Sequence, residues 1–193
     1  MTSTTLGLVR HGQTDWNLAL LLQGSTDVPL NETGRLQAKQ AASKINADNW
    51  DVLLCSPLDR AHETADAFGL VLGLQPIVVE GLIERSFGTA EGLSIAEWRT
   101  LHDKHDEIQG IETLAQLKSR ATALLELIAT EYAGLRVLAI SHGALIRKLI
   151  TLVSDGEYPL ENDRLQNVSL NRLEHADGVW TLSEYAPQSL ADI

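Results

Sequence analysis

The sequence predicts an α/β protein of three layers, in which a mostly parallel six-stranded sheet is flanked by helices. Short apolar or β-branched runs typical of buried strands alternate with longer segments of helical periodicity. Two runs near the C-terminal end lie close enough together to pair as a hairpin. No internal repeat, low-complexity tract or linker interrupts the chain, so we expect a single domain over residues 1–193.

The strands are expected where the apolar runs occur. They are predicted at residues 6–9, 51–55, 76–79, 135–140, 168–173 and 179–185. The first four alternate with helical segments, which favours parallel pairing through crossover connections. The last two are expected to turn at Asp177 and Gly178, a dipeptide that favours a tight hairpin.

The helices are expected between these strands, over about residues 31–45, 56–72, 94–105, 114–132 and 144–153. For the second helix, Ser56 is expected as the N-cap and Pro57 as the first helical residue, because these residue types favour those positions. Residues 81–110 are rich in glycine and charge, and their helical signal is confined to 94–105. We expect a short lid insertion at about residues 92–113.

The composition is that of an ordinary globular protein. Apolar residues make up 44% and charged residues 21%, and a chain of 193 residues can bury a core without disulfides. The one cysteine, Cys55, cannot form an intramolecular disulfide. No apolar run is long enough for a transmembrane helix, and residues 1–5 carry no basic residue of a secretory signal. A cytoplasmic location is therefore expected.

The charge balance is strongly acidic. Asp and Glu total 26 against 15 Lys and Arg, which gives a formal net charge of −11. Such a surface repels phosphate backbones, so neither nucleic acid nor an anionic membrane is expected as the main partner. A small anionic substrate stays possible, because a few arginines in a pocket dominate the local field. The oligomeric state is left open.

Two histidines directly follow predicted parallel strands. His11 comes after Arg10 at the end of the first strand, and His142 comes at the end of the fourth. The second strand leads through a short loop to Arg60. Ligands of such sheets bind beyond the carboxyl ends of the strands, so these side chains are expected around one point. Two guanidinium groups there would bind a tetrahedral dianion well.

Two histidines beside such arginines indicate chemistry on phosphorus. A neutral imidazole nitrogen can attack phosphorus to give a phosphohistidine, while nearby cations stabilise charge on the transferring oxygens. His11 fits the nucleophile, since Gly12 permits close backbone approach, and His142 would supply a further donor. The leaving alkoxide needs an acid, for which Glu84 is the candidate.

Five segments resemble the histidine phosphatase superfamily, whose fold is phosphoglycerate-mutase-like. They read LVRHGQTDWN at residues 8–17, LNETGRLQA at 30–38, CSPLDRAHETA at 55–65, ERSFGTAEG at 84–92 and SHG at 141–143. They occur in the order of the family and cover most of residues 6–150. An isolated Arg-His-Gly triplet would be weak evidence, but this ordered set is highly specific.

The resemblance implies a role for each matching residue. His11 matches the phosphorylated nucleophile and Glu84 the proton donor. The positions that match the phosphate pocket are Arg10, Arg60 and His142. The positions that match the substrate side are Asn17, Gln23, Gly24, Arg85 and Gly143. Members of the family need neither a metal nor an organic cofactor, so none is expected, and the expected partner is a small phosphorylated metabolite.

The same core can hydrolyse phosphomonoesters or move a phosphoryl group within one substrate, depending on whether water reaches the phosphohistidine. Arg85, which directly follows Glu84, resembles the mutase pattern. The short segment 92–113, without the paired arginines of glycolytic mutases, favours a phosphatase instead. We predict a metal-independent phosphomonoester hydrolase, with a phosphoglycerate-type mutase as the alternative. A protein phosphohistidine phosphatase or a catalytically silent binding protein is less favoured.

Some residues have a second interpretation. Glu91 is the rival of Glu84 as the acid, and Asn17 could merely cap the local turn. Five basic residues could favour a second anionic group such as a carboxylate: Arg85, Arg99, His102, Lys104 and His105. The last four could equally form a solvated helix face. The two lid histidines have a spacing that could ligate a metal, but no further ligands lie nearby in the sequence.

Overall fold

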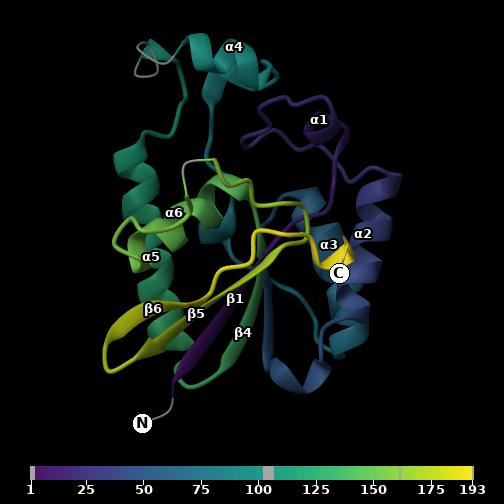
Figure 1. Ribbon diagram of the computed structural model, residues 1–193, viewed down its shortest axis with the longest axis vertical. Helices are drawn as coiled ribbons and strands as arrows, with labels where there is room; N and C mark the ends of the chain where they lie inside the picture. The colour runs from purple at the N-terminus through teal and green to yellow at the C-terminus, as the bar shows by residue number, and fades with distance from the viewer. Residues whose placement is uncertain (1–2, 102–106, 161, 193) are drawn as a thin grey trace.

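A six-stranded sheet forms the middle layer of the computed structural model, which describes residues 3–101, 107–160 and 162–192 (Figure 1). Its strands are β1 (Thr4–Arg10), β2 (Val52–Cys55), β3 (Ile77–Val78), β4 (Arg136–Ser141), β5 (Leu170–Ala176) and β6 (Val179–Glu184). Their order across the sheet is β3-β2-β4-β1-β5-β6. The first four in this order are parallel, whereas β5 is antiparallel to both β1 and β6. The predicted fold class is confirmed.

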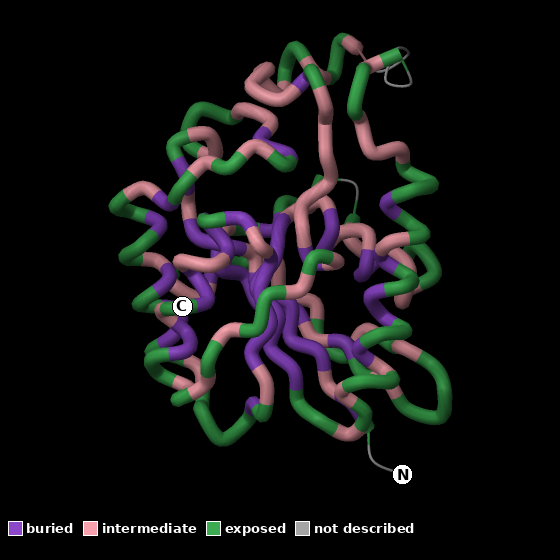
Figure 2. The backbone as a smooth tube through the Cα atoms, turned by 180° about the vertical axis from the view of Figure 1, so that it is seen from behind, coloured by how far each residue is buried: buried purple, intermediate pink, exposed green. Residues whose placement is uncertain are grey.

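Helices cover both faces of this sheet (Figure 1). The helices α2 (Glu32–Ser43) and α3 (Asp59–Leu72) lie on one face, and α5 (Leu114–Glu131) and α6 (Gly143–Val153) lie on the other. Each face has its own hydrophobic core, and neighbouring residues of β1 contribute to opposite cores: Leu8 to that of α5 and α6, Val9 to that of α2 and α3. Figure 2 shows the buried backbone gathered in this central region.

The register of the sheet sets the position of the candidate site. Arg10 of β1 is paired with Ser141 of β4, and Cys55 of β2 is paired with Ile140 of β4. The carboxyl ends of the three parallel strands therefore lie side by side. The residues that follow, His11, His142 and Ser56, leave the sheet at the same edge.

The start of α3 differs from the prediction. The helix begins at Asp59 with Leu58 as its N-cap, so the assignment of Ser56 as N-cap and Pro57 as first helical residue is wrong. Leu58 has no capping side chain, and the carboxylate of Asp27, from a distant loop, accepts from the main-chain N–H of Asp59 at 2.9 Å. A tertiary contact thus replaces the local cap, and the Ser56 side chain is directed to the site.

Two short helices, α1 and α4, lie above the sheet (Figure 1). The four-residue helix α1 (Asp15–Leu18) was not predicted, because one turn is too short to show a helical period, and a capping box between Thr14 and Asn17 stabilises it. The helix α4 (Ile95–Thr100) is shorter than the predicted span of residues 94–105, of which 102–105 lie outside the described residues. Short 3₁₀ turns occur at Ala47–Asn49, Glu80–Leu82, Gly88–Ala90 and Leu190–Asp192.

The loop after β1 touches the first turn of α2 through two glycines. A Cβ atom on Gly12 would lie 2.5 Å from the carbonyl oxygen of Gly34, and one on Gly34 would lie 2.0 Å from the carbonyl oxygen of Gln13. Both glycines belong to the segments that carry the family resemblance. They permit the backbone contact that holds the loop after His11.

Among the helices that the structure describes, none is both long and apolar enough to cross a membrane.

Candidate active site

A cavity of about 670 Å³ opens at the edge where β1 and β4 end. Most of the predicted site residues line it: Arg10, His11, Asn17, Gln23, Gly24, Arg60, Glu84 and Gly143. Two predicted residues do not belong to its wall, namely His142, whose ring lies beside that of His11, and Arg85. The folded chain thus brings together side chains from positions 10 to 143 of the sequence.

His11 has the geometry of a nucleophile. Its side chain is 2% exposed, and its Nδ1 lies 2.7 Å from the carbonyl oxygen of Gly12, which can only accept, so Nδ1 carries the proton. Nε2 therefore holds the lone pair, and no hydrogen-bond partner for it exists within the described residues. Burial lowers the pKa of His11 well below 6.5, and the positive charges of Arg60 and Arg10 lower it further. The imidazole is neutral and its free nitrogen can attack phosphorus.

Two buried guanidinium groups flank this histidine. Arg10 donates through Nη1 to the carbonyl of Leu165 at 2.6 Å. Arg60, which is fully buried, donates to the carbonyls of Gly24 at 2.7 Å and Thr26 at 2.9 Å. Burial lowers the pKa of both groups, but arginine stays protonated in proteins. The hydrogen bonds to carbonyl groups fix the orientation of both guanidinium groups without neutralising their charge.

His142 lies beside His11, with the ring centroids 5.1 Å apart. It is fully buried, and its Nε2 lies 2.7 Å from the hydroxyl oxygen of Ser56. That oxygen accepts from the N–H of Leu58 at 3.3 Å, and its own hydrogen has no other acceptor among the described residues, so it is donated to Nε2. Nδ1 of His142 then carries the ring proton. Burial lowers the pKa of His142 well below 6.5, with Arg60, His11 and Arg10 adding to this effect.

Three buried nitrogens of this group have no hydrogen-bond partner. They are Nε of Arg10, Nε of Arg60 and Nδ1 of His142, among five such side-chain atoms in the described part of the chain. An unpaired buried donor is costly, at about 1–3 kcal/mol. Three of them around one neutral imidazole make a site suited to an anion with several acceptor oxygens, such as a phosphoryl group.

Glu84 reaches the same place from the loop after the 3₁₀ turn Glu80–Leu82. Its Oε2 accepts from the N–H of Ala144 at 3.0 Å, and its Oε1 accepts from the N–H of Leu145 at 3.1 Å and of Arg85 at 2.8 Å. The first turn of α6 therefore holds the carboxylate, as helix N-termini hold anions. Oε2 of Glu84 accepts only this one hydrogen bond within the described residues. It lies 4.0 Å from the position that a Cβ atom on Gly143 would take.

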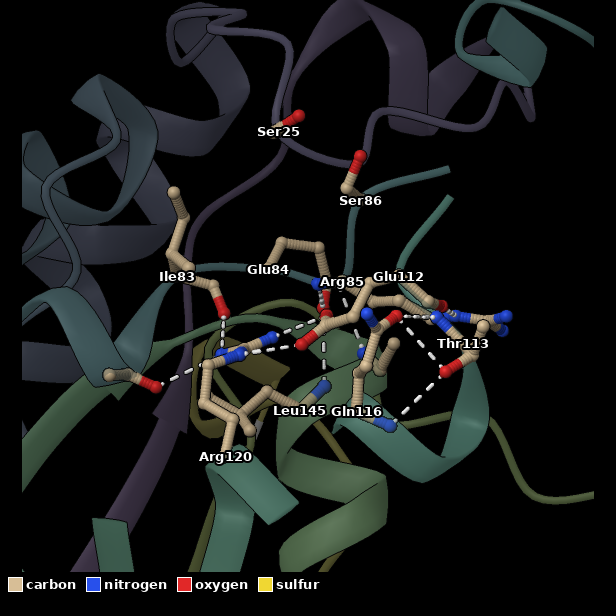
Figure 3. Close-up of polar contacts among 12 residues, drawn as sticks. Ser25, Ile83, Glu84, Arg85, Ser86, Glu112, Thr113, Gln116, Arg120 and Leu145 are labelled. Atoms are coloured by element: carbon tan, nitrogen blue, oxygen red, sulfur yellow. Dashed lines mark hydrogen bonds and ion pairs between the residues drawn. The ribbon is translucent and has the colours of Figure 1, made fainter. Parts of the chain in front are cut away.

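Arg120 supports the loop that carries Glu84 (Figure 3). Its guanidinium donates to the carbonyls of Gly81 at 3.0 Å and Ile83 at 2.7 Å. It also forms a two-pronged pair with Glu112, with N–O distances of 2.8 and 2.7 Å. The 3₁₀ turn Glu80–Leu82, the segment at Glu112 and helix α5 thus share one charged anchor just before the acidic residue.

Glu91, the rival acid, has a structural position. Its two oxygens accept from the N–H and hydroxyl groups of Ser25 and Thr26 and from the N–H of Phe87. Burial raises its pKa, but these hydrogen bonds outweigh the burial, so the pKa is lowered overall. Glu91 does not line the cavity and joins the loop at Gly24 to the segment after Glu84.

The remaining predicted residues differ in their contacts. Asn17 both caps α1, accepting from the N–H of Thr14 at 3.2 Å, and lines the cavity. Gln23 is buried and accepts from the hydroxyl of Thr14 at 2.9 Å. Gly24 has φ +56°, and a Cβ atom there would lie 2.1 Å from Glu91. The backbone conformation that turns the carbonyl of Gly24 toward Arg60 therefore requires glycine at this position.

Arg85 does not reach the cavity. Its Nε donates to the carbonyl of Glu112 at 2.9 Å, and its guanidinium lies 5.1 Å from the ring centroid of Phe87. Arg99 of α4 does line the cavity. The other lid residues that were considered, His102, Lys104 and His105, lie outside the described residues. Within the described ranges, no three His, Cys, Asp or Glu side chains lie close enough to hold a metal ion.

Several residues at the site were missed by the sequence analysis. Asn167 donates through Nδ2 to the carbonyl of His11 at 2.9 Å and to Oδ1 of Asn17 at 3.2 Å. Ser56 contacts His142, although it was assigned to a helix cap. Arg147 and Arg164 line the cavity. Ser56 lies within the matching segment 55–65 and Arg147 lies shortly after the segment 141–143, whereas Asn167 and Arg164 lie in a stretch without any periodic signal.

Comparison with known proteins identifies the family. The family model for the histidine phosphatase superfamily (branch 1) matches residues 6–187. The Bacillus subtilis protein named uncharacterized phosphatase PhoE is 37% identical over 182 residues, which cover 94% of each chain. A probable phosphoglycerate mutase GpmB of Photorhabdus laumondii is 29% identical, over 96% of this chain and 92% of its own.

A solved structure agrees with these sequence matches. The phosphoserine phosphatase of Entamoeba histolytica, as a mutant in complex with phosphoserine, superposes with a TM-score of 0.83 at 26% identity. The match covers 98% of this chain and all of that one. The fold and the site define an α/β enzyme with an arginine-lined cavity at the ends of its parallel strands. The chain belongs to the histidine phosphatase superfamily.

Proposed function

We propose that the protein hydrolyses phosphomonoesters of small metabolites through a phosphohistidine on His11. One observation carries this proposal: the free Nε2 of a neutral, buried His11 lies among three buried donors that lack a partner, on Arg10, Arg60 and His142. A phosphoryl group would supply acceptors to all three donors and an electrophile to the nitrogen.

In the first step, Nε2 of His11 attacks phosphorus and forms a P–N bond while the P–O bond to the leaving group breaks. Glu84 gives its proton to the departing alkoxide, which leaves as an alcohol. Arg10, Arg60 and His142 donate to the equatorial oxygens, where charge is concentrated in the transition state. The N–H of Gly12 donates to Thr64 and not into the cavity, so the side chains supply this stabilisation.

In the second step, the Glu84 carboxylate takes a proton from a water molecule. The water oxygen attacks phosphorus, the P–N bond breaks, and its electron pair returns to Nε2 of His11. Inorganic phosphate then leaves. This cycle requires no metal ion and no organic cofactor, because guanidinium groups supply the positive charge.

The substrate-side residues have smaller roles in this proposal. Asn17 accepts two hydrogen bonds through Oδ1, which leaves its Nδ2 able to donate into the cavity. Gln23 and Gly24 line the cavity, and Gly24 also holds Arg60. Gly143 lines the cavity at the start of α6, where a Cβ atom would make ordinary van der Waals contacts with Arg10 and Glu84. Arg85 has no part in it, since its contacts are with Glu112 and Phe87.

A mutase is the second candidate, and the resemblance to proteins named probable phosphoglycerate mutase favours it. Two observations favour hydrolysis. The helix α4 over the cavity has only six residues, and Arg85, the residue of the mutase pattern, faces away from the cavity. We therefore propose that residues 92–113 form a thin lid, within one domain, that admits water to the phosphohistidine.

The proposed partner is a phosphorylated small molecule, and the Entamoeba relative is described in complex with phosphoserine. The net charge of −11 disfavours nucleic acid and anionic membranes. We place the protein in the cytoplasm as part of this proposal, supported by its one cysteine, Cys55, which is buried and free.

Phosphate release from p-nitrophenyl phosphate in the presence of EDTA tests the proposal, with isomerisation of 3-phosphoglycerate followed in parallel. We expect release by the native protein and none above background by His11→Ala. A ³²P-labelled substrate should leave acid-labile, base-stable label on the native chain alone. Activity that survives in His11→Ala, or that requires a metal, would reject the mechanism, and isomerisation without release would establish the mutase.

A further inference from the structure

Half of the arginines of this acidic protein lie around one cavity. Of the ten arginines in the sequence, five line it: Arg10, Arg60, Arg99, Arg147 and Arg164. The carboxylates of the lining are only Glu84 and Asp163. A chain with 26 acidic and 15 basic residues thus has a cavity whose lining carries three more positive than negative groups.

These five arginines also differ from the others in their partners. Arg35, Arg120, Arg136 and Arg172, all outside the cavity, pair with carboxylates at 2.6 to 2.9 Å. Within the described residues, none of the five cavity arginines has a carboxylate within 4.0 Å. Of the arginines outside the cavity, only Arg85 lacks such a pair within the described residues, and it donates instead to the carbonyl of Glu112. The gathering of five arginines without carboxylate partners around one cavity therefore points to an anionic ligand.

Phosphoryl binding accounts for only two of the five. Arg10 and Arg60 have buried Nε atoms without a partner, whereas the other three come from α4, α6 and the loop before β5 and have no such buried atom. Arg147 follows Gly143 by one helical turn on the same face of α6. Four residues advance a helix by about 6 Å, which is the distance from a phosphoryl group to a second charged group two or three carbons away.

The loop before β5 connects the two groups of arginines. Its carbonyl at Asp163 accepts from Nη1 of Arg147 at 2.6 Å, and its carbonyl at Leu165 accepts from Nη1 of Arg10 at 2.6 Å. Arg164 lies between these two residues and has no hydrogen-bond partner in the described part of the chain. The Asp163 carboxylate accepts through Oδ2 from the hydroxyl of Tyr185 at 2.8 Å and from the N–H of Leu160 at 3.2 Å, and within the described residues it forms no ion pair with either arginine.

We propose that Arg99, Arg147 and Arg164 form a second anion site, so that the cavity takes phosphomonoesters that carry a carboxylate or a second phosphate. This inference rests on the proposed function, because the first anion is the phosphoryl group at His11. Apolar side chains line the space between the two sites and contact the body of the substrate; they include Leu21, Phe87, Ile95 and Trp98. The cavity of about 670 Å³ has room for a substrate larger than a triose.

Matched substrate pairs test this second site. 3-Phosphoglycerate and glycerol 3-phosphate share a carbon skeleton and differ in the carboxylate; fructose 1,6-bisphosphate and fructose 6-phosphate differ in the second phosphate. We expect the native enzyme to prefer at least one doubly anionic member by about tenfold or more in kcat/KM. The pair that shows the preference identifies the anion.

The variants Arg147→Gln and Arg164→Gln should lower that preference ratio about tenfold each, and Arg99→Gln should lower it less, because α4 holds it at the rim. Arg172→Gln, which removes the same charge from an exposed pair with Glu184, is the matched control and should leave the ratio unchanged. A native ratio near one, or a ratio unaffected in both Arg147→Gln and Arg164→Gln, would overturn the second site.

Binding separates this inference from the proposed function. In His11→Ala, calorimetry can measure the dissociation constants of the same pairs without turnover. If native protein releases no phosphate from p-nitrophenyl phosphate, the proposed hydrolysis fails, and the binding preference still decides the second site. If p-nitrophenyl phosphate is hydrolysed but neither pair shows a preference in rate or binding, hydrolysis stands and the second site is rejected.

Discussion

The hydroxyl oxygen of Ser56 lies 2.7 Å from Nε2 of His142, and both residues are fully buried at the ends of neighbouring strands. The N–H of Leu58 donates to the same oxygen, so the hydroxyl hydrogen is directed to His142. This places the ring proton on Nδ1, the buried atom without a partner. Ser56 thereby sets which nitrogen of His142 can donate to a phosphoryl oxygen.

Replacement of this serine should weaken catalysis without removing a group that touches substrate. We expect Ser56→Ala to lower kcat about tenfold, because Nδ1 of His142 no longer carries its proton in every molecule. Ser169→Ala is the control, since Ser169 is equally buried and its hydroxyl has no partner. Equal kcat values for the two variants would contradict this role, and NMR of the His142 ring nitrogens would show the tautomer directly.

The pH dependence of activity should reflect the environment of His11. Burial, Arg60 and Arg10 lower its pKa well below 6.5, and catalysis requires the neutral ring. As pH falls, the ring therefore stays neutral past the ordinary titration range of histidine. We expect no loss of kcat/KM attributable to an enzyme group near pH 6.5, after correction for substrate ionisation. An NMR titration of the His11 ring that gave a pKa of 6.5 or above would contradict this.

Substitution of the two loop carboxylates, Glu84 and Glu91, should affect different properties: the first activity, the second stability. Glu84→Gln removes the proton donor, so hydrolysis of glycerol 3-phosphate should fall roughly 100-fold. The loss of kcat/KM, which reports the first step, should be much smaller with p-nitrophenyl phosphate, whose leaving group needs no proton. The kcat should fall on both substrates, because the second step loses its base. Glu91→Gln should instead lower the free energy of unfolding by about 1–2 kcal/mol, because Ser25, Thr26 and Phe87 lose acceptors.

Rates on the two substrates and urea denaturation of both variants check these expectations. The acid would be misassigned if Glu91→Gln, and not Glu84→Gln, showed the dependence on leaving group. An equal loss of kcat/KM on both substrates in Glu84→Gln would contradict the role as proton donor.

The anchor at Arg120 should contribute to stability. Arg120→Met leaves the carboxylate of Glu112 unpaired and frees the carbonyls of Gly81 and Ile83. The Arg120 and Glu112 side chains are only 21% and 16% exposed, so we expect a loss of roughly 2 kcal/mol in the free energy of unfolding. Arg35→Met breaks an exposed pair with Glu63 and should cost less than about 1 kcal/mol. Equal losses in urea denaturation would contradict the anchor.

The sequence alone was sufficient for the sheet and for the centre of the site. Buried strands have continuous apolar runs, so β1, β2 and β4 could be predicted, and residues that directly follow parallel strands meet at one edge. His11, Arg10 and Arg60 could therefore be assigned to one site from the sequence alone. The ordered segments of the family added Glu84, which local periodicity does not indicate. Whether each of these residues acts as proposed stays a prediction for the experiments above.

Other features depended on contacts between distant segments. Ser56 looks like a helix cap in the sequence, but a carboxylate from Asp27 serves the helix and leaves the serine to His142. Arg85 matches a substrate contact in the sequence, yet Glu112 and Phe87 hold it away from the cavity. Arg147 and Arg164 join the site only because α6 and the loop before β5 fold against the ends of the strands. A local pattern specifies the backbone of one segment, whereas the partner of a polar side chain is chosen among all segments that reach it in the folded chain.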